Sequence, residues 1–121
     1  MRCRGIRGAT TVEENTREAI LQATKELLSE IIEANQLEAD DVAYAYFTTT
    51  ADVNAEFPAL AARELGWTQV ALLCGHEMNV PGSLQQCIRI LILCNTEKAA
   101  DEIVHVYIRG AKSLRTFNTQ I

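Results

Sequence analysis

Hydrophobic positions recur with the period of a helix in one long segment near the N-terminus. Within residues 16–34, apolar side chains lie three or four positions apart, and charged side chains fill the opposite positions. This spacing predicts an amphipathic helix with one buried face and one solvated face. Asn15 is the predicted N-cap, because Glu18 three residues later completes a capping-box spacing. The apolar positions are Ile20, Ala23, Leu27, Leu28, Ile31 and Ala34.

Five shorter segments have the alternation, or the β-branched and aromatic content, of strands. They are residues 2–8, 42–50, 67–74, 86–95 and 103–109. The clearest alternation is in 86–95, where Ile88, Ile90 and Ile92 face one way, opposite to Cys87, Arg89, Leu91 and Leu93.

A second helix is predicted between Pro58 and Gly66, since proline suits the first turn of a helix and glycine its end. Residues 75–82 then form a loop. About five strands and two main helices predict an α/β (α+β) domain built on one mixed sheet. So few helices leave one face of the sheet partly uncovered. Neighbouring subunits are a natural cover for that face, so we expect an oligomer.

The length and composition are those of one ordinary globular domain. The 121 residues, 48% hydrophobic and 22% charged, predict a single domain over 1–121, with a mobile C-terminal tail from about residue 111. A net charge of −5 argues against a nucleic-acid partner. We find no apolar run long enough for a membrane span and no secretory leader, which favours the cytoplasm and excludes a membrane partner.

Cysteine and histidine spacing predicts no metal site. The chain has no Cys-x-x-Cys, and neither His76 nor His105 completes a zinc-binding pattern. The chain has four cysteines, Cys3, Cys74, Cys87 and Cys94, and we expect three of the four to be reduced, mostly buried thiols without a further role.

Arg89 interrupts the most apolar segment of the chain and is the most informative residue. An isolated buried charge costs several kcal/mol, so this guanidinium must meet a protein carboxylate, reach solvent, or face a cleft that takes an anion. Composition and spacing do not decide between a structural Arg–Glu pair and a ligand site.

The other polar candidates are individually ordinary. Tyr107 and Arg7 lie in predicted strands, and Glu77 and His76 lie in a loop at a strand end, where small domains often build sites. We find neither a nucleophile–base–orienter arrangement nor a phosphate-binding glycine motif. The residues alone therefore predict an α/β domain with an arginine-lined anion site as its candidate function.

As whole strings, the sequence resembles the trimeric, monofunctional (AroH-type) chorismate mutases, and not the all-helical ones. The resemblance runs from residue 2 to about 115. It is carried by residues 4–12 (RGIRGATTV), 57–59 (FPA), 62–65 with Trp67, Cys74, 77–84, 87–89 (CIR), 105–107 (HVY) and 114–115 (LR).

This resemblance implies a homotrimeric pseudo-α/β barrel that converts chorismate to prephenate, on the route to phenylalanine and tyrosine, without a cofactor. It implies that Arg89 donates to the ether oxygen of the breaking bond and that Arg7 and Tyr107 hold carboxylate and ether groups. Glu77 and Cys74 would hold the ring hydroxyl. The neighbouring subunit would add Phe57, Ala59 and Arg63, and Arg115 would cap the cleft.

The chain departs from the family pattern at three places. Leu60 stands where the family has lysine, one residue is missing between Leu65 and Trp67, and residues 116–118 read Thr-Phe-Asn instead of continuing with Pro-Asp. None of these changes touches Arg89.

The implied chemistry agrees with the residues. A unimolecular rearrangement needs positioning and a fixed cation, not a nucleophile, base or metal. The competing hypothesis is a non-enzymatic trimer that senses an anionic metabolite. Glu77 argues against it, because a pure anion binder gains little from a carboxylate near its ligand.

Overall fold

The computed structural model describes residues 1–116, of which the side chains of residues 115 and 116 stay outside the description. In chain order the elements are β1 (Arg2–Thr11), α1 (Arg17–Asn35), η1 (Ala39–Asp41), β2 (Val42–Thr49), α2 (Ala59–Glu64), β3 (Ala71–His76), β4 (Cys87–Thr96), η2 (Ala100–Glu102), β5 (Val106–Tyr107) and η3 (Arg109–Thr116). The η elements are short 3₁₀ helices.

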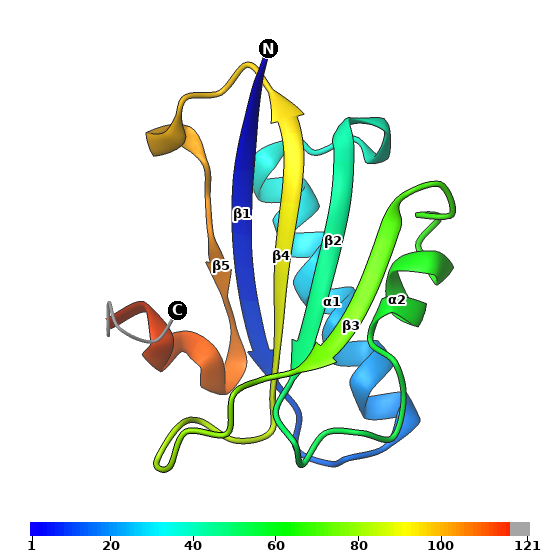
Figure 1. Cartoon of the computed structure of the whole chain (residues 1–121), viewed down its shortest axis with the longest axis vertical. Coiled ribbons are helices and arrows are strands. Elements are labelled where there is room, and N and C mark those ends of the chain that lie inside the picture. The colour runs from blue at the N-terminus through cyan, green and yellow to red at the C-terminus, as the bar shows by residue number, and fades with distance from the viewer. Residues whose placement is uncertain (117–121) are drawn as a thin grey trace.

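The five strands form one mixed sheet in the order β3-β2-β4-β1-β5 (Figure 1). The central strand β4 is antiparallel to both β1 and β2, and the outer strands β3 and β5 run parallel to their neighbours. The predicted mixed sheet with two main helices is confirmed.

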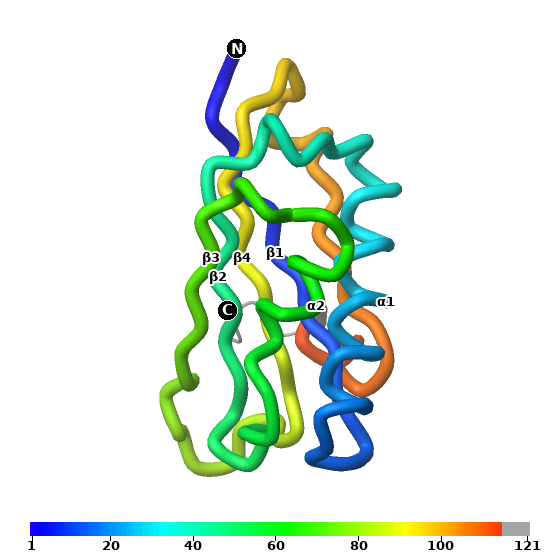
Figure 2. Tube along the Cα trace, turned by 90° about the vertical axis from the view of Figure 1, so that its right-hand side faces the viewer, coloured from blue at the N-terminus to red at the C-terminus, as the bar shows by residue number. Residues whose placement is uncertain are grey.

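Both α-helices pack on the same face of the sheet, which Figure 2 shows edge-on. The core between them holds Leu27 and Ile31 of α1 against Phe47 of β2 and Ile90 of β4, each no more than 2% exposed. Gly8 permits this close packing of α1 on β1, because a Cβ there would lie 2.6 Å from Ile31 Cδ1.

The opposite face of the sheet, here called the bare face, carries no α-helix in the described part of the chain. Only η3 covers its edge, where Ala111 packs on Ala9 and Cys87. Elsewhere the bare face exposes large apolar side chains: Leu73 is 66% and Leu91 is 40% exposed. These two residues belong to an apolar depression of about 410 Å³, lined by Tyr44, Ala45, Tyr46, Ala71, Leu72, Leu73 and Leu91.

Some predicted boundaries are wrong. Thr16, not Asn15, caps α1, because Thr16 is extended and its hydroxyl accepts a hydrogen bond from the Ala19 amide. Asn15 instead accepts from the amides of Asn54 and Ala55 and so holds the loop before α2.

Three strands also differ from their predicted extents. The first, β1, runs on to Thr11 instead of ending at residue 8, and β3 continues to His76, two residues into the predicted loop. Residues 67–70 do not join β3: Trp67 is buried in the core just after α2, and pairing begins at Ala71. The alternating run 103–109 yields only the two-residue β5, since Val104 bonds through its backbone to the Asn35 side chain instead. Of the tail, residues 109–116 form η3, and residues 117–121 lie outside the described chain.

Candidate active site

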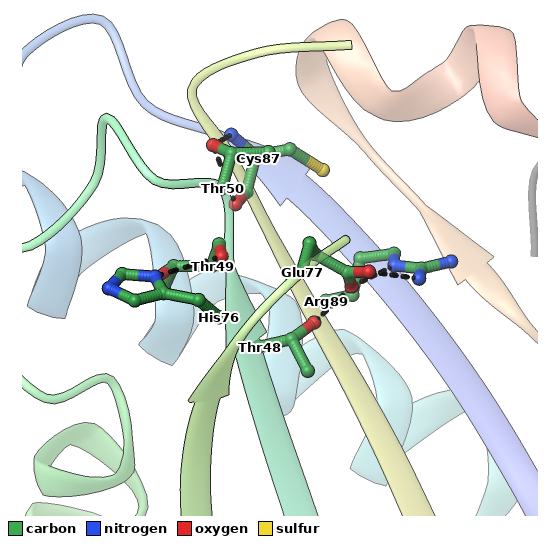
Figure 3. Close-up of polar contacts among 7 residues, drawn as sticks. All are labelled: Thr48, Thr49, Thr50, His76, Glu77, Cys87 and Arg89. Carbon is green, nitrogen blue, oxygen red and sulfur yellow. Dashed lines mark hydrogen bonds and ion pairs between the residues drawn. The ribbon is translucent and has the colours of Figure 1, made fainter. Parts of the chain in front are cut away.

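Arg89 and Glu77 form a two-pronged ion pair on the bare face (Figure 3). Arg89 Nε donates to Glu77 Oε2 and Arg89 Nη2 donates to Oε1, both at 2.6 Å. The side chains are 29% and 18% exposed, so the pair is partly desolvated but still open to solvent. The guanidinium therefore pairs with a protein carboxylate and also faces an open cleft. The sequence had left these two environments as alternatives, and the structure shows both.

The strands fix this geometry. Arg89 lies directly across from Thr48 of β2 in the antiparallel ladder. The Glu77 amide donates to the Thr49 carbonyl at 2.9 Å, which continues the β2–β3 pairing by one residue beyond His76. As a result the Glu77 side chain lies over Thr48, whose hydroxyl donates to Glu77 Oε2 (Figure 3).

The beginning of β4 is held separately. Asp52 accepts from the Gln86 amide and from the Thr50 hydroxyl, and that hydroxyl in turn accepts from the Cys87 amide at 3.0 Å. Gln86 has a φ of +53°, a conformation that few non-glycine residues adopt without such support. This network fixes the start of β4, two residues before Arg89, and so helps to hold the Arg89 side chain in position.

A hollow of about 340 Å³ surrounds the ion pair, within the size range of small-molecule sites. It brings together four of the predicted site residues, each from a different strand or strand end: Arg7, Glu77, Arg89 and Tyr107. The Arg7 backbone amide donates to His105 Nδ1, which anchors β1 beside the segment leading into β5. Burial, and then the charge of Arg7, lower the pKa of His105.

The electrostatics of the hollow favour the charged forms of both Glu77 and Arg89. Burial raises the pKa of Glu77, but the hydrogen bonds from Arg89 and Thr48 and the charge of Arg89 outweigh it, so the pKa lies below its usual value. The hydrogen bond to Glu77 raises the pKa of Arg89 further. At neutral pH the hollow therefore presents a fixed cation and an ionised hydrogen-bond acceptor side by side.

The other predicted residues form a second group around α2. Phe57 and Cys74 line a different hollow of about 310 Å³, and the Phe57 side chain is 69% exposed. Burial raises the pKa of Cys74, while the Ala59 backbone amide and the charge of Arg63 lower it; the net direction is upward. A neutral thiol at Cys74 can donate or accept a hydrogen bond but is a weak nucleophile.

The two groups lie on opposite sides of the sheet. Cys74 packs toward the helices with the main core, whereas Glu77 faces the bare side. Within one chain, Cys74 and Glu77 therefore do not meet, although the resemblance assigns them the same substrate hydroxyl.

Three neighbours of the ion pair had not been singled out from the sequence: Thr48, Met78 and Leu114. The alternation of β2 could have identified Thr48, since it puts Thr48 on the face of Tyr44 and Tyr46. Arg115 follows Leu114 in η3, but its side chain lies outside the described residues.

The described residues contain neither a cluster of side chains suited to a metal ion nor a helix able to cross a membrane. They hold no cluster of three or more His, Cys, Asp or Glu side chains suited to a metal ion. None of their helices has the length and apolar character that crossing a membrane requires.

Comparisons with known proteins identify the family of the chain. The family model for chorismate mutase type I matches residues 3–117. The chorismate mutase AroH of Thermus thermophilus is 51% identical over 113 residues, 93% of each chain, and that of Bacillus subtilis is 46% identical over the full length of both. A solved chorismate mutase from Clostridium thermocellum superposes with a TM-score of 0.89 at 51% identity, covering 90% of this chain and 97% of that one. With matches of this extent in both sequence and structure, the chain belongs to the chorismate mutase type I family.

Proposed function

We propose that this chorismate mutase rearranges chorismate to prephenate in clefts between the subunits of a homotrimer, with Arg89 as the principal catalytic group. The observation that carries the proposal is the Arg89–Glu77 pair at the floor of an open hollow that also contains Arg7 and Tyr107. Family membership supplies the reaction. The reaction belongs to the biosynthesis of phenylalanine and tyrosine.

The chemistry asks for a cation where negative charge develops. As the C–O bond of chorismate breaks, charge grows on the ether oxygen, and a donor fixed at that position stabilises the transition state more than the substrate. Arg89 suits this role because a guanidinium stays charged and its donors lie in a planar fork. A 10⁶-fold acceleration corresponds to about 8 kcal/mol, which folding the substrate and this electrostatic contact must supply together.

The remaining residues of the hollow hold the substrate. Arg7 is exposed on β1 and binds a carboxylate, and Tyr107 adds a hydroxyl to the carboxylate and ether groups. Glu77 accepts the hydrogen bond of the ring hydroxyl. In binding, the substrate takes over donors of Arg89 that contact Glu77 in the free chain.

The split between the two groups of residues supports a shared cleft. Phe57, Ala59, Arg63 and Cys74 lie on the helix side of the sheet, so they reach the ring hydroxyl and carboxylates of a substrate held on the bare face only from a second chain. In this arrangement the apolar bare face is buried between subunits, and Arg115 caps the cleft. Because Leu60 replaces lysine, the rim carries one charge fewer than in the family pattern.

Two further properties belong to the same proposal. The four free cysteines, one of them exposed, fit a reducing compartment, and we place the enzyme in the cytoplasm. A sensor that binds chorismate without converting it is the disfavoured alternative, because it would not need an ionised Glu77 beside the arginine.

The direct test is to incubate the protein with chorismate and follow the loss of its ultraviolet absorbance. We expect rapid conversion to prephenate, and the same rate after treatment with EDTA, because the proposed mechanism uses only side chains of this chain. If chorismate binds and its absorbance does not change, the protein is a sensor and not an enzyme.

A mixing experiment tests the shared cleft. Arg63→Ala and Arg89→Ala chains, each impaired alone, are unfolded together and reassembled in equal amounts. If every cleft takes Arg63 from one chain and Arg89 from another, about one quarter of the clefts regain both side chains. Activity should rise toward that fraction of wild type. Mixed trimers, verified by mass, that regain no activity would rule out a cleft built from two chains.

A further inference from the structure

Thr48 contacts one of the two carboxylate oxygens of Glu77. Its hydroxyl donates to Glu77 Oε2, the oxygen that also receives Arg89 Nε, while Oε1 receives only the Nη2 donor among the contacts described above. Thr48 is held in the middle of the sheet, paired with Gly75 on β3 and with Arg89 on β4. The backbone of Thr48 is thus fixed by two neighbouring strands, and its side chain reaches Glu77 from the sheet.

The two donors to Glu77 differ in what happens to them during the reaction. When Arg89 turns to the ether oxygen, Glu77 loses its main cationic partner, although burial still disfavours its ionised form. Thr48 has no such second task. Its hydrogen bond to Oε2 can remain while Oε1 becomes available to the ring hydroxyl.

We infer that Thr48 is a positioning residue for catalysis, which keeps Glu77 ionised and oriented once Arg89 engages the substrate. The inference rests on the proposed function, since it presupposes that Arg89 and Glu77 both serve the rearrangement. It assigns strand β2, between β3 and β4, a part in the site that neither the resemblance nor the spacing of charged residues indicated.

Other groups near Glu77 do not substitute for Thr48. Arg7 of β1 and Tyr107 of β5 share the hollow but are committed to the substrate in the proposed site. His76, the neighbour of Glu77, contacts the Thr49 side chain and carbonyl instead (Figure 3). Cys87 of β4 has a pKa raised to about 11 by burial, so it stays neutral and offers no charge at working pH.

The test compares Thr48→Val, which keeps the shape and loses the hydroxyl, with Thr48→Ser, which keeps the hydroxyl. Removing a donor to the ionised carboxylate raises the pKa of Glu77, so the acidic limb of kcat against pH moves to higher pH in Thr48→Val. At the acidic end of the range, kcat falls by about tenfold relative to wild type, the usual effect of one hydrogen bond to a charged group. Thr48→Ser restores the wild-type limb.

A second readout does not depend on turnover. Carbon-13 NMR of protein labelled at glutamate side chains follows the titration of Glu77 directly, with the resonance assigned by its absence in Glu77→Gln. We expect the Glu77 titration to move to higher pH in Thr48→Val, and not in Thr49→Val, which removes a hydroxyl from the adjacent position on the opposite face of β2. In the Glu77→Gln background, Thr48→Val should cause no further change in the pH profile.

The outcomes separate this inference from the proposed function. If Thr48→Val titrates like wild type in both measurements, or if Thr48→Ser is impaired as much as Thr48→Val, the positioning role is wrong while the rearrangement stands. If the wild-type protein does not convert chorismate, the proposed function fails. The NMR titration then still decides whether Thr48 holds Glu77 ionised.

Discussion

Replacing Arg89 with alanine should lower kcat by at least 10²- to 10³-fold while KM changes much less. Losing one preorganised donor to developing charge typically has a cost of that size, and here a full charge is removed. The split between kcat and KM follows if the contact is made mainly in the transition state. Arg89→Lys keeps the charge but loses the planar fork that reaches both oxygens of Glu77, so it should also be severely impaired.

The measurement needs a check on folding, because Arg89→Ala also leaves the half-buried Glu77 without its cationic partner. Circular dichroism and native mass should match wild type before kcat is compared. Arg4→Ala is the matched control: Arg4 is another arginine of the sheet, whose Nε donates to the Lys98 carbonyl away from the hollow, and kcat should be retained. A folded, correctly assembled Arg89→Ala enzyme within a few-fold of wild-type kcat would make Arg89 a purely structural residue.

Leu73→Glu should abolish assembly and, with it, nearly all activity. Leu73 is 66% exposed in the single chain, so a carboxylate there does not disturb the folding of the subunit. In the proposed trimer the same position is buried, and an unpaired buried charge costs several kcal/mol at each interface. Native mass spectrometry should therefore show folded monomers, and the chorismate assay should show loss of turnover, because no cleft is complete in one chain.

The control for this prediction adds the same carboxylate on the helix side of the molecule. Ser29 is exposed on α1, away from the bare face, and Ser29→Glu should form normal trimers with normal activity. If Leu73→Glu is still trimeric and active, the bare face is not the subunit interface. Any activity regained in the mixing experiment would then come from subunits that meet through another surface.

The Arg89–Glu77 pair adds a pH dependence to the Arg89 prediction. The pKa of Glu77 lies below its usual value in the folded chain, so its pairing with Arg89 contributes stability above the unfolded pKa of a glutamate. That contribution is lost as the pH falls through the lowered pKa. Folding checks on Arg89→Ala therefore belong near neutral pH, where the wild-type pair is fully formed.

Local patterns determined much of the fold. The helical period of residues 16–34 predicted α1 to within about one residue at each end, and the strict alternation around Ile88–Ile92 predicted β4. These elements are long and have one buried face, so the burial of that face imposes their periods on the sequence. The weaker alternation of residues 103–109 gave only two residues of strand, since competition from the Asn35 side chain is invisible to a local pattern.

The candidate site depended on the tertiary structure far more. Taken alone, the sequence identified Arg89 as a charge that needs a partner, and the family resemblance named the residues around it. Neither established that Glu77 is that partner in the free chain. The pair spans 12 positions and forms because β3, β2 and β4 lie side by side, an order that does not follow the chain.

The same reason explains the division of the site. With a loop predicted from residue 75, nothing fixed the relative directions of Cys74 and Glu77; the structure continues β3 through His76, and alternation then puts the two side chains on opposite faces. Thr48 became visible only through its register opposite Arg89. The sequence by itself determined the main elements, the fold class and the need to satisfy an arginine within an apolar strand, because these follow from local burial. Which groups meet in the hollow was decided by strand order and register, which pair residues far apart in the chain.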